Sequence, residues 1–113
     1  MSKTLFEKIC DREIPADIVY EDEWCVAFKD INPQAPFHVQ LVPRKPITML
    51  ASADAGDQAL LGHLMLTAPR VAAAAGFGEA FRLAVNNGAA VGQSVFHLHI
   101  HILAGRPFKW PPG

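Results

Sequence analysis

The chain is 113 residues long, carries a formal net charge of −1, and is 50% hydrophobic and 19% charged. That length suits one domain with a single hydrophobic core, and that balance excludes an intrinsically disordered chain. The lysines and arginines are scattered, which gives no support for a nucleic acid or an anionic membrane surface as a partner. We therefore expect a single domain over residues 1–113.

The start of the chain and its two cysteines bear on the compartment. The stretch MSKTLFEKIC lacks the apolar run of a signal peptide, and no segment approaches the roughly 20 apolar residues of a membrane span. Cys10 and Cys25 are isolated and have no framework spacing, so we expect two reduced thiols rather than a disulfide. These observations predict a cytoplasmic protein.

The first third of the chain predicts a short helix followed by strands. Thr4 and Glu7 form a capping-box pattern, which predicts a helix from about Leu5 to Arg12 that ends before a proline. Strands are then predicted over 18–21, 24–29 and 37–43, with a turn-rich connection over 30–36.

The middle of the chain predicts one long helix from Asp54 to about Gly76, capped by Ser52, because leucines recur there at helical spacing. Pro69 should kink or interrupt this helix, since its ring clashes with the carbonyl four residues earlier. Strands follow over 80–85 and 95–103, with a small-residue loop over 86–94 and an irregular tail over 106–113. Two helices and five short strands without regular alternation indicate an α+β fold with a mostly antiparallel sheet.

Three of the five histidines alternate with aliphatic residues in the stretch FHLHIHIL. On a strand, His97, His99 and His101 share one face, and the aliphatic residues between them share the other. The aliphatic face belongs on the core. The histidine face should then border a cleft, because three imidazoles in an apolar core would leave polar nitrogens unsatisfied. A single histidine there would be an ordinary half-buried residue, whereas three at this period indicate function.

Two kinds of chemistry fit three imidazoles on one face. Three histidines can hold zinc with an open coordination position, although no acidic residue stands close by in the sequence to orient them. Alternatively, a neutral imidazole can attack phosphorus when its far nitrogen is held protonated by a hydrogen bond. Gly92 and Ser94, just before the histidines, favour phosphate. Glycine lets backbone N–H groups approach an anion closely, and serine adds a hydroxyl donor.

The segment from His97 to Leu103 fits the pattern His-φ-His-φ-His-φ-φ, with φ apolar, and so resembles the histidine triad (HIT) family. The segments DINPQAPFHVQLVPRKPI and NNGAAVGQSVFHLHIHILAGRPFKWPPG are similar to its Hint branch, the purine nucleoside phosphoramidases. The similarity runs from about Leu5 to Gly113. It implies a HIT-like fold, a mostly antiparallel five-stranded sheet with two helices, continued across a homodimer. It also implies metal-independent hydrolysis of adenosine or guanosine 5'-phosphoramidates and aminoacyl adenylates, with no cofactor.

The resemblance also assigns roles to individual residues. His99 is the nucleophile that takes the nucleotidyl group, His101 contacts the phosphate, and His97 supports the geometry of the site. His38 matches a fourth histidine that helps to position the active centre, and Ser94 belongs to the phosphate-side loop. The other nucleotide-binding residues implied are the ribose acid Asp30 with its neighbour Ile31, the loop residues Asn86, Gly92 and Gln93, and the apolar base walls Phe6, Ile9 and Phe28.

The sequence departs from the family pattern in places. Gln40 stands where an aliphatic residue is usual, beside the base pocket or core, and Pro69 lies in a helix that commonly contributes to the dimer interface. Some bacterial relatives carry a zinc site that begins with a cysteine pair near the N-terminus. Here Cys10 stands alone, so we expect no structural zinc. His63 has no partner at triad spacing and is expected to be a solvated or helix-packing residue.

Other functions stay open on the sequence. A dinucleoside polyphosphate hydrolase or a nucleotidyl transferase would share the triad, but those branches generally lack the WPPG tail of residues 110–113. A nucleotide-binding interaction protein with vestigial catalysis is a third reading, against which the complete triad and Ser94 argue. The leading prediction is a purine nucleoside phosphoramidase that works through a covalent His99–nucleotide intermediate.

Overall fold

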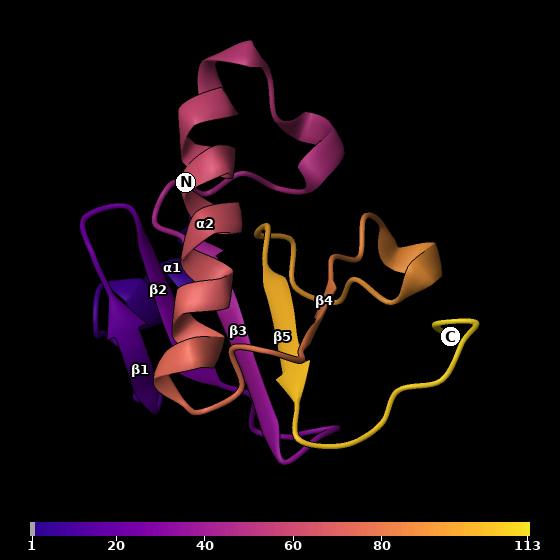
Figure 1. Cartoon of the computed structure of the whole chain (residues 1–113). Coiled ribbons are helices and arrows are strands. Elements are labelled where there is room, and N and C mark those ends of the chain that lie inside the picture. The colour runs from indigo at the N-terminus through magenta and orange to yellow at the C-terminus, as the bar shows by residue number, and fades with distance from the viewer. Residues whose placement is uncertain (1) are drawn as a thin grey trace.

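The computed structural model of the chain describes residues 2–113 and is built on one five-stranded sheet (Figure 1). Neighbouring strands are antiparallel throughout, in the order β1–β2–β3–β5–β4. This arrangement confirms the predicted α+β fold. The strands are β1 (Ile18–Glu21), β2 (Cys25–Lys29), β3 (Phe37–Pro43), β4 (Arg82–Ala84) and β5 (Ile100–Ala104).

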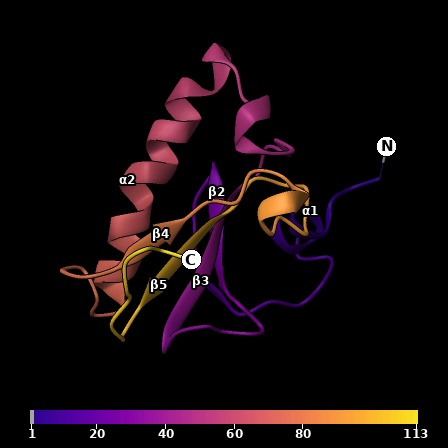
Figure 2. The ribbon, with the colours of Figure 1, turned by 90° about the vertical axis from the view of Figure 1, so that its right-hand side faces the viewer.

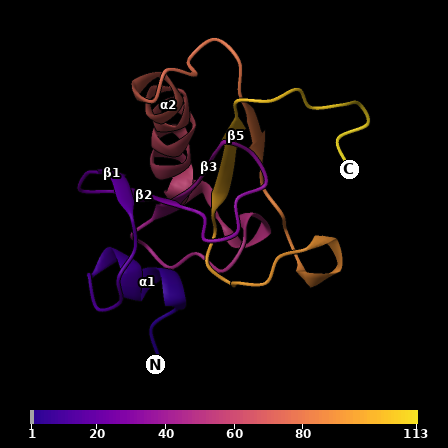
Figure 3. The ribbon, with the colours of Figure 1, turned by 90° about the horizontal axis from the view of Figure 1, so that it is seen from below.

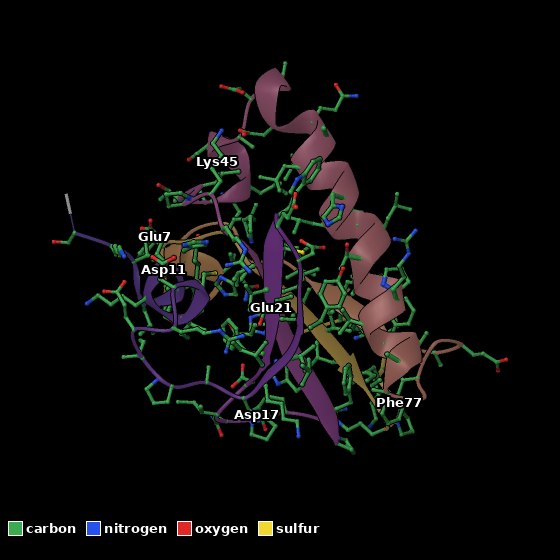
Figure 4. The ribbon with its side chains drawn as sticks, turned by 90° about the vertical axis from the view of Figure 1, so that its left-hand side faces the viewer. Glu7, Asp11, Asp17, Glu21, Lys45 and Phe77 are labelled. Atoms are coloured by element: carbon green, nitrogen blue, oxygen red, sulfur yellow. The ribbon has the colours of Figure 1, made fainter. Side chains whose placement is uncertain are left out.

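Two α-helices, α1 (Leu5–Cys10) and α2 (Gln58–Ala74), lie on opposite sides of the sheet (Figures 2 and 3). Glu7 belongs to α1 on one side, whereas Phe77 follows α2 on the other (Figure 4). The connections also contain three 3-10 helices, η1 (Leu50–Ser52), η2 (Ala55–Asp57) and η3 (Ala89–Val91).

The larger core lies between the sheet and α2. Successive side chains of a strand point to opposite faces, so each central strand sends alternate residues into this core. Ala27, Leu41 and Ile102 are buried there against Leu64 and Ala68 of α2. The predicted division of β5 is therefore correct, with its isoleucines on the core side.

The opposite face of the sheet is only partly covered, because α1 has six residues. Phe6 and Ile9 of α1 pack against Val26, Phe28 and Val42 and form a second, smaller core. The part of this face that carries the histidines of β3 and β5 extends beyond α1. Loops rather than a helix close around it, which leaves room for a cavity.

The predicted capping box starts α1. The Thr4 hydroxyl accepts a hydrogen bond from the Glu7 backbone N–H, and the Glu7 carboxylate accepts one from the Thr4 N–H, both at 2.9 Å. The helix ends at Cys10, two residues earlier than predicted, and Arg12 then adopts a left-handed conformation with φ of 59°.

The long helix differs from its prediction at the start and at the proline. Residues before α2 form the separate turn η2, whose N-cap Asp54 accepts the Gly56 N–H at 2.8 Å, and Ser52 ends η1 instead of capping a helix. Pro69 does not interrupt α2, which continues to Ala74. A proline removes one helical hydrogen bond, here to the carbonyl of Met65. Met65 is 54% exposed, so this bond is lost on the solvent side of the helix.

The last two strands begin later than predicted. β4 has three residues rather than six, and β5 begins at Ile100 rather than at residue 95. Residues 95–99 are not in the ladder, although β3 extends two residues past Leu41, the partner of Ile100. The Leu98 N–H bonds instead to the carbonyl of Ile47. The side chains of this segment still alternate, with Leu98 in the α2 core and His97 beside Phe6 of α1.

No helix in the described part of the chain has the length and apolar character needed to cross a membrane. Cys10 and Cys25 are both buried and free, as predicted. Burial raises the pKa of Cys10 to about 11 and that of Cys25 to about 12, so both thiols are protonated at neutral pH.

Candidate active site

A cavity of about 720 Å³ opens on the side of the sheet that faces α1. This volume lies within the usual range for small-molecule sites. Phe28, Gln40 and His101 lie side by side on neighbouring strands of its floor. The lining therefore changes across the sheet from apolar to histidine-rich.

His99 lies in the cavity wall with 7% of its surface exposed. Its Nδ1 is 2.8 Å from the carbonyl oxygen of His97. Because a carbonyl can only accept, Nδ1 carries the proton, and the neutral form of the ring has its lone pair on Nε2. Phe6 packs edge-on against the ring, with 5.0 Å between the ring centroids. His99 therefore offers an oriented, unprotonated nitrogen that can act as a nucleophile.

His97 differs from the expectation that all three histidines border a cleft. Its side chain is fully buried and does not line the cavity. Nε2 donates to the carbonyl of Pro43 at 2.7 Å, and Nδ1 lies 2.7 Å from the hydroxyl of Thr4. Both ring nitrogens are thus paired, which removes the usual penalty for a buried imidazole. Burial lowers the pKa of His97, so its ring is neutral.

The rings of His38 and His101 are joined by a hydrogen bond whose direction is set by the backbone of Gln34. The backbone N–H of Gln34 donates to His38 Nδ1 at 3.0 Å, which places the His38 proton on Nε2. That N–H points to His101 Nδ1, 2.9 Å away, so the proton of a neutral His101 sits on its own Nε2. A single backbone donor thereby makes His101 a hydrogen-bond donor within the cavity.

The electrostatic setting keeps this pair neutral. Burial lowers the pKa of His38, although the carboxylate of Asp30 acts in the opposite direction. Burial, together with the neighbouring His99 and His38, lowers the pKa of His101 to about 4. Hydrogen-bond direction, rather than positive charge, therefore prepares these residues for an anion at neutral pH.

Asp30 sits at the turn after β2, where its carboxylate has several partners. Oδ1 accepts the Asn32 backbone N–H at 2.8 Å, and Oδ2 accepts the amide of Gln40 at 2.9 Å. Two bonds leave acceptor positions on both oxygens, because a carboxylate offers about four lone-pair sites. Gln40 is thus tied to Asp30, and its own Oε1 is buried without a hydrogen-bond partner.

The loop before β5 brings small residues to the cavity. Asn86, Gly92 and Ser94 line it, and Gly92 has φ of 107°, a conformation that favours glycine. Gln93 does not line the cavity, in contrast to its predicted place in the nucleotide-binding set. Its side chain is 3% exposed, accepts the Gly88 N–H and donates to the carbonyls of Thr48 and Val95. The Gln93 side chain therefore stabilises the loop from its buried side, and Gly92 and Ser94 lie at the surface of the cavity.

The apolar residues predicted from the resemblance also meet here. Phe6 and Phe28 pack edge-to-face at 5.3 Å, Ile9 adjoins them, and Ile31 at the rim is fully exposed. An aliphatic side chain with no apolar neighbour is suited to cover a bound ring. Several lining residues were not anticipated: Leu5, Pro15, Ala16, Asp17, Lys29, Asn32, Gln34 and Val95. Most lie in connections, where sequence periodicity carries no information about direction.

Within residues 2–113, two groups of side chains bring three potential metal ligands together. The first is Asp30, His38 and His101. His38 Nε2 must carry a proton there, because Gln34 already donates to Nδ1, and a protonated nitrogen cannot bind a metal. This set therefore fits a hydrogen-bond relay rather than a cation.

The second group is Asp22, Cys25 and His63, on the α2 side. The Asp22 carboxylate accepts bonds from Tyr20 and from two backbone N–H groups and lies 2.7 Å from His63 Nε2. The Cys25 thiol lies 3.4 Å from the same carboxylate, and burial and that negative charge raise its pKa. His63, expected to be a solvated or helix-packing residue, is paired with Asp22 and packs on Trp24 with 4.7 Å between the ring centroids.

A five-stranded antiparallel sheet with an oriented imidazole facing a cavity is the arrangement expected of a histidine triad protein. Comparison with known proteins agrees, since residues 11–108 match the HIT domain. The chain belongs to the HIT family, and its fold is that of HIT family hydrolases.

Relatives in both sequence and structure span nearly the whole chain. An uncharacterised HIT-like protein of Synechocystis is 66% identical over 110 residues, covering 97% of this chain and 96% of that protein. The 14 kDa zinc-binding protein of Zea mays is 45% identical, covering 99% and 89%. The crystal structure of a HIT family hydrolase from Legionella pneumophila superposes with a TM-score of 0.95 at 42% identity, covering 98% of this chain and all of the other.

The lowered pKa of His101 predicts a specific acid sensitivity. An unfolded histidine titrates near pH 6.5 and the folded His101 at about 4, so between these values the unfolded state binds more protons. The free energy of unfolding should therefore fall as the pH drops from about 6.5 to about 4. His101→Gln should remove up to about 3 kcal/mol of this loss. Urea unfolding at several pH values measures it, and an unchanged pH slope in the variant would contradict the assignment.

Proposed function

We propose that this protein is a purine nucleoside phosphoramidase of the Hint type. It hydrolyses adenosine or guanosine 5'-phosphoramidates and aminoacyl adenylates and releases AMP or GMP. The observation that carries this proposal is the hydrogen bond from His99 Nδ1 to the His97 carbonyl. It holds the proton on Nδ1 of a buried ring and directs Nε2, as the nucleophile, into a cavity that also contains donors for a phosphate.

In the first step, His99 Nε2 forms a bond to phosphorus and the bond from phosphorus to the leaving amine breaks. His101 Nε2–H is suited to stabilise the phosphate oxygens, and Ser94 to assist the departing amine, which must gain a proton. In the second step, a water oxygen bonds to phosphorus as the bond to Nε2 breaks, and the proton that this water loses replaces the one that the departing amine took from the site. This step returns His99 to its starting form and releases the nucleoside monophosphate.

The lining of the cavity supports a nucleoside as the group transferred. Phe6, Ile9 and Phe28 provide an apolar wall for a purine. Asp30 retains acceptor positions for the two ribose hydroxyls after bonding Asn32 and Gln40. The proposed substrate therefore rests on residues suited to a base and a ribose as well as on those suited to a phosphate.

We propose that the reaction needs no metal and no cofactor. The relative from Zea mays is named a zinc-binding protein. Within residues 2–113, two three-residue groups could approach a cation. In one, His38 Nε2 carries a proton, and in the other, Asp22 and His63 bond to each other. Two free, buried thiols support a reducing compartment, and we place the enzyme in the cytoplasm on that basis.

We further propose that the enzyme is a homodimer whose sheet continues across the interface. β4 is an edge strand of three residues, and edge strands expose backbone groups that can pair with another chain. Met65 and Leu66 of α2 are 54% and 63% exposed. The tail is attached at β4, because Phe108 stacks on Arg82, while Trp110 beyond it is 83% exposed and positioned to reach a partner.

A rate comparison with EDTA present tests the activity. Adenosine phosphoramidate should be hydrolysed faster than a dinucleoside tetraphosphate, with no loss of rate in EDTA. The reverse preference would favour the polyphosphate hydrolase reading. Binding of AMP without any turnover would favour an interaction protein. Strong inhibition by EDTA that zinc reverses would overturn the metal-independent mechanism.

The covalent step predicts a labelled peptide. Wild-type enzyme quenched during turnover should carry one nucleotidyl group on the peptide containing His99, visible by mass spectrometry. His99→Ala should carry none and should lose far more than the roughly 10²–10³-fold expected for one transition-state donor. It should still bind nucleoside monophosphate, because Asp30, Phe6 and Phe28 are unchanged.

Ser94→Ala is the comparison variant for this experiment, because its loss of activity should be smaller than that of His99→Ala. Ser94 is expected to donate a hydrogen bond only, so its loss should cost about 10²–10³-fold and leave the labelled peptide detectable. A label on His97 or His101 would show that the nucleophile is misassigned. Rapid turnover by His99→Ala would contradict the covalent mechanism itself.

The dimer proposal predicts the behaviour of two matched surface variants. Light scattering should give a dimer for the wild type at micromolar concentration. Leu66→Glu places a charge on the exposed face of α2 and should weaken the dimer. Val19→Glu places the same charge on β1, at the other edge of the sheet where Val19 is 41% exposed, and should not. A wild type that is only monomeric would contradict the proposal.

A further inference from the structure

Thr4 takes part in two separate hydrogen-bond networks. It is the N-cap of α1, where its hydroxyl oxygen accepts the Glu7 backbone N–H at 2.9 Å. The same oxygen lies 2.7 Å from His97 Nδ1, 93 residues further along the chain. A helix cap requires the first contact but not the second.

The direction of the second contact follows from the other side of the His97 ring. Nε2 is 2.7 Å from the carbonyl of Pro43, which can only accept, so Nε2 carries the proton. A neutral His97 then has a lone pair at Nδ1, and the Thr4 hydroxyl must donate to it. Thr4 thus uses its proton on His97 and an acceptor lone pair on α1.

The fixed position of His97 in turn orients the proposed nucleophile, His99. Its backbone carbonyl accepts the Nδ1 proton of His99 at 2.8 Å, and Phe6 of α1 packs edge-on against both rings. We infer that Thr4 is a positioning residue for the reaction: its hydroxyl holds His97 in one tautomer and orientation, and thereby fixes the carbonyl that orients His99. This inference rests on the proposed function for its effect on rate, but not for its effect on the tautomers.

The chain offers a control that separates positioning from capping. Glu7→Ala removes the other half of the capping box, the bond from the Thr4 N–H to the Glu7 carboxylate, and leaves the Thr4 hydroxyl able to donate to His97. It also removes a negative charge that raises the pKa of His97. Thr4→Asp keeps the helix cap and removes the donor to His97. Aspartate is at least as good an N-cap as threonine, but a carboxylate cannot donate to a lone pair at Nδ1. Thr4→Ser keeps both the cap and the donor.

The experiment measures ring tautomers, rates and melting temperature for these three variants. Long-range ¹H–¹⁵N correlation spectra should show His97 and His99 unchanged in Glu7→Ala and Thr4→Ser, and His97 altered in Thr4→Asp. With adenosine phosphoramidate at neutral pH, Thr4→Asp should lower kcat by about ten- to a hundredfold, the range expected when a reacting group is misplaced. Glu7→Ala should lower the melting temperature at least as much as Thr4→Asp while changing kcat less than about twofold.

The pH dependence gives a second readout that a purely structural role would not produce. A carboxylate beside Nδ1 favours a protonated His97, which can donate to it, so the ratio of kcat in Thr4→Asp to wild type should rise as the pH falls. Wild-type tautomers together with wild-type kcat in Thr4→Asp would overturn the inference. If the wild type hydrolyses no phosphoramidate, the proposed function fails, and the spectra alone still decide the role of Thr4.

Discussion

The site depends on the hydrogen bond between the His99 ring and the carbonyl of His97. That carbonyl is available because regular pairing of β5 begins only at Ile100, although β3 continues past its partner Leu41 to Pro43. In a strand extending back to residue 95, backbone groups would be engaged in a ladder. The irregular segment before β5 is therefore a functional feature, since it turns a backbone acceptor toward a side chain. It also explains why the triad lies at a strand end rather than within one.

The second constraint on the site is that its buried histidine rings are uncharged. Two carbonyls and one backbone N–H determine where the protons of four imidazoles lie, without any charged partner at the nucleophile. Burial lowers the pKa of His97, His38 and His101, which avoids the large cost of burying a charge. In the proposed function, such rings would bind an anion through N–H groups that point into the cavity. This mode of binding requires exact orientation, so the residues behind the cavity matter as much as those lining it.

The two faces of the sheet have different roles: one packs the main hydrophobic core, and the other carries the candidate active site. The α2 face carries a continuous apolar core that includes Leu98 and Ile100. The α1 face carries a short helix and a cavity, and the cavity lining includes Gln40 with its buried, unpaired Oε1. Alternation along three neighbouring strands lets one short sheet serve both purposes.

The sequence by itself determined the elements whose signals are local. The alternation of His97–Leu103 predicted which side chains face the core, and the Thr4–Glu7 pattern predicted the cap of α1, because both depend on neighbouring residues. It did not locate the start of β5, the continuity of α2 through Pro69, or the partner of His63, since each depends on where another element ends or packs. Only the tertiary structure decided the protonation of the histidines. Their partners, Pro43, Gln34 and Thr4, are backbone groups or side chains 54, 4 and 93 residues away, and spacing in the chain carries no record of such contacts.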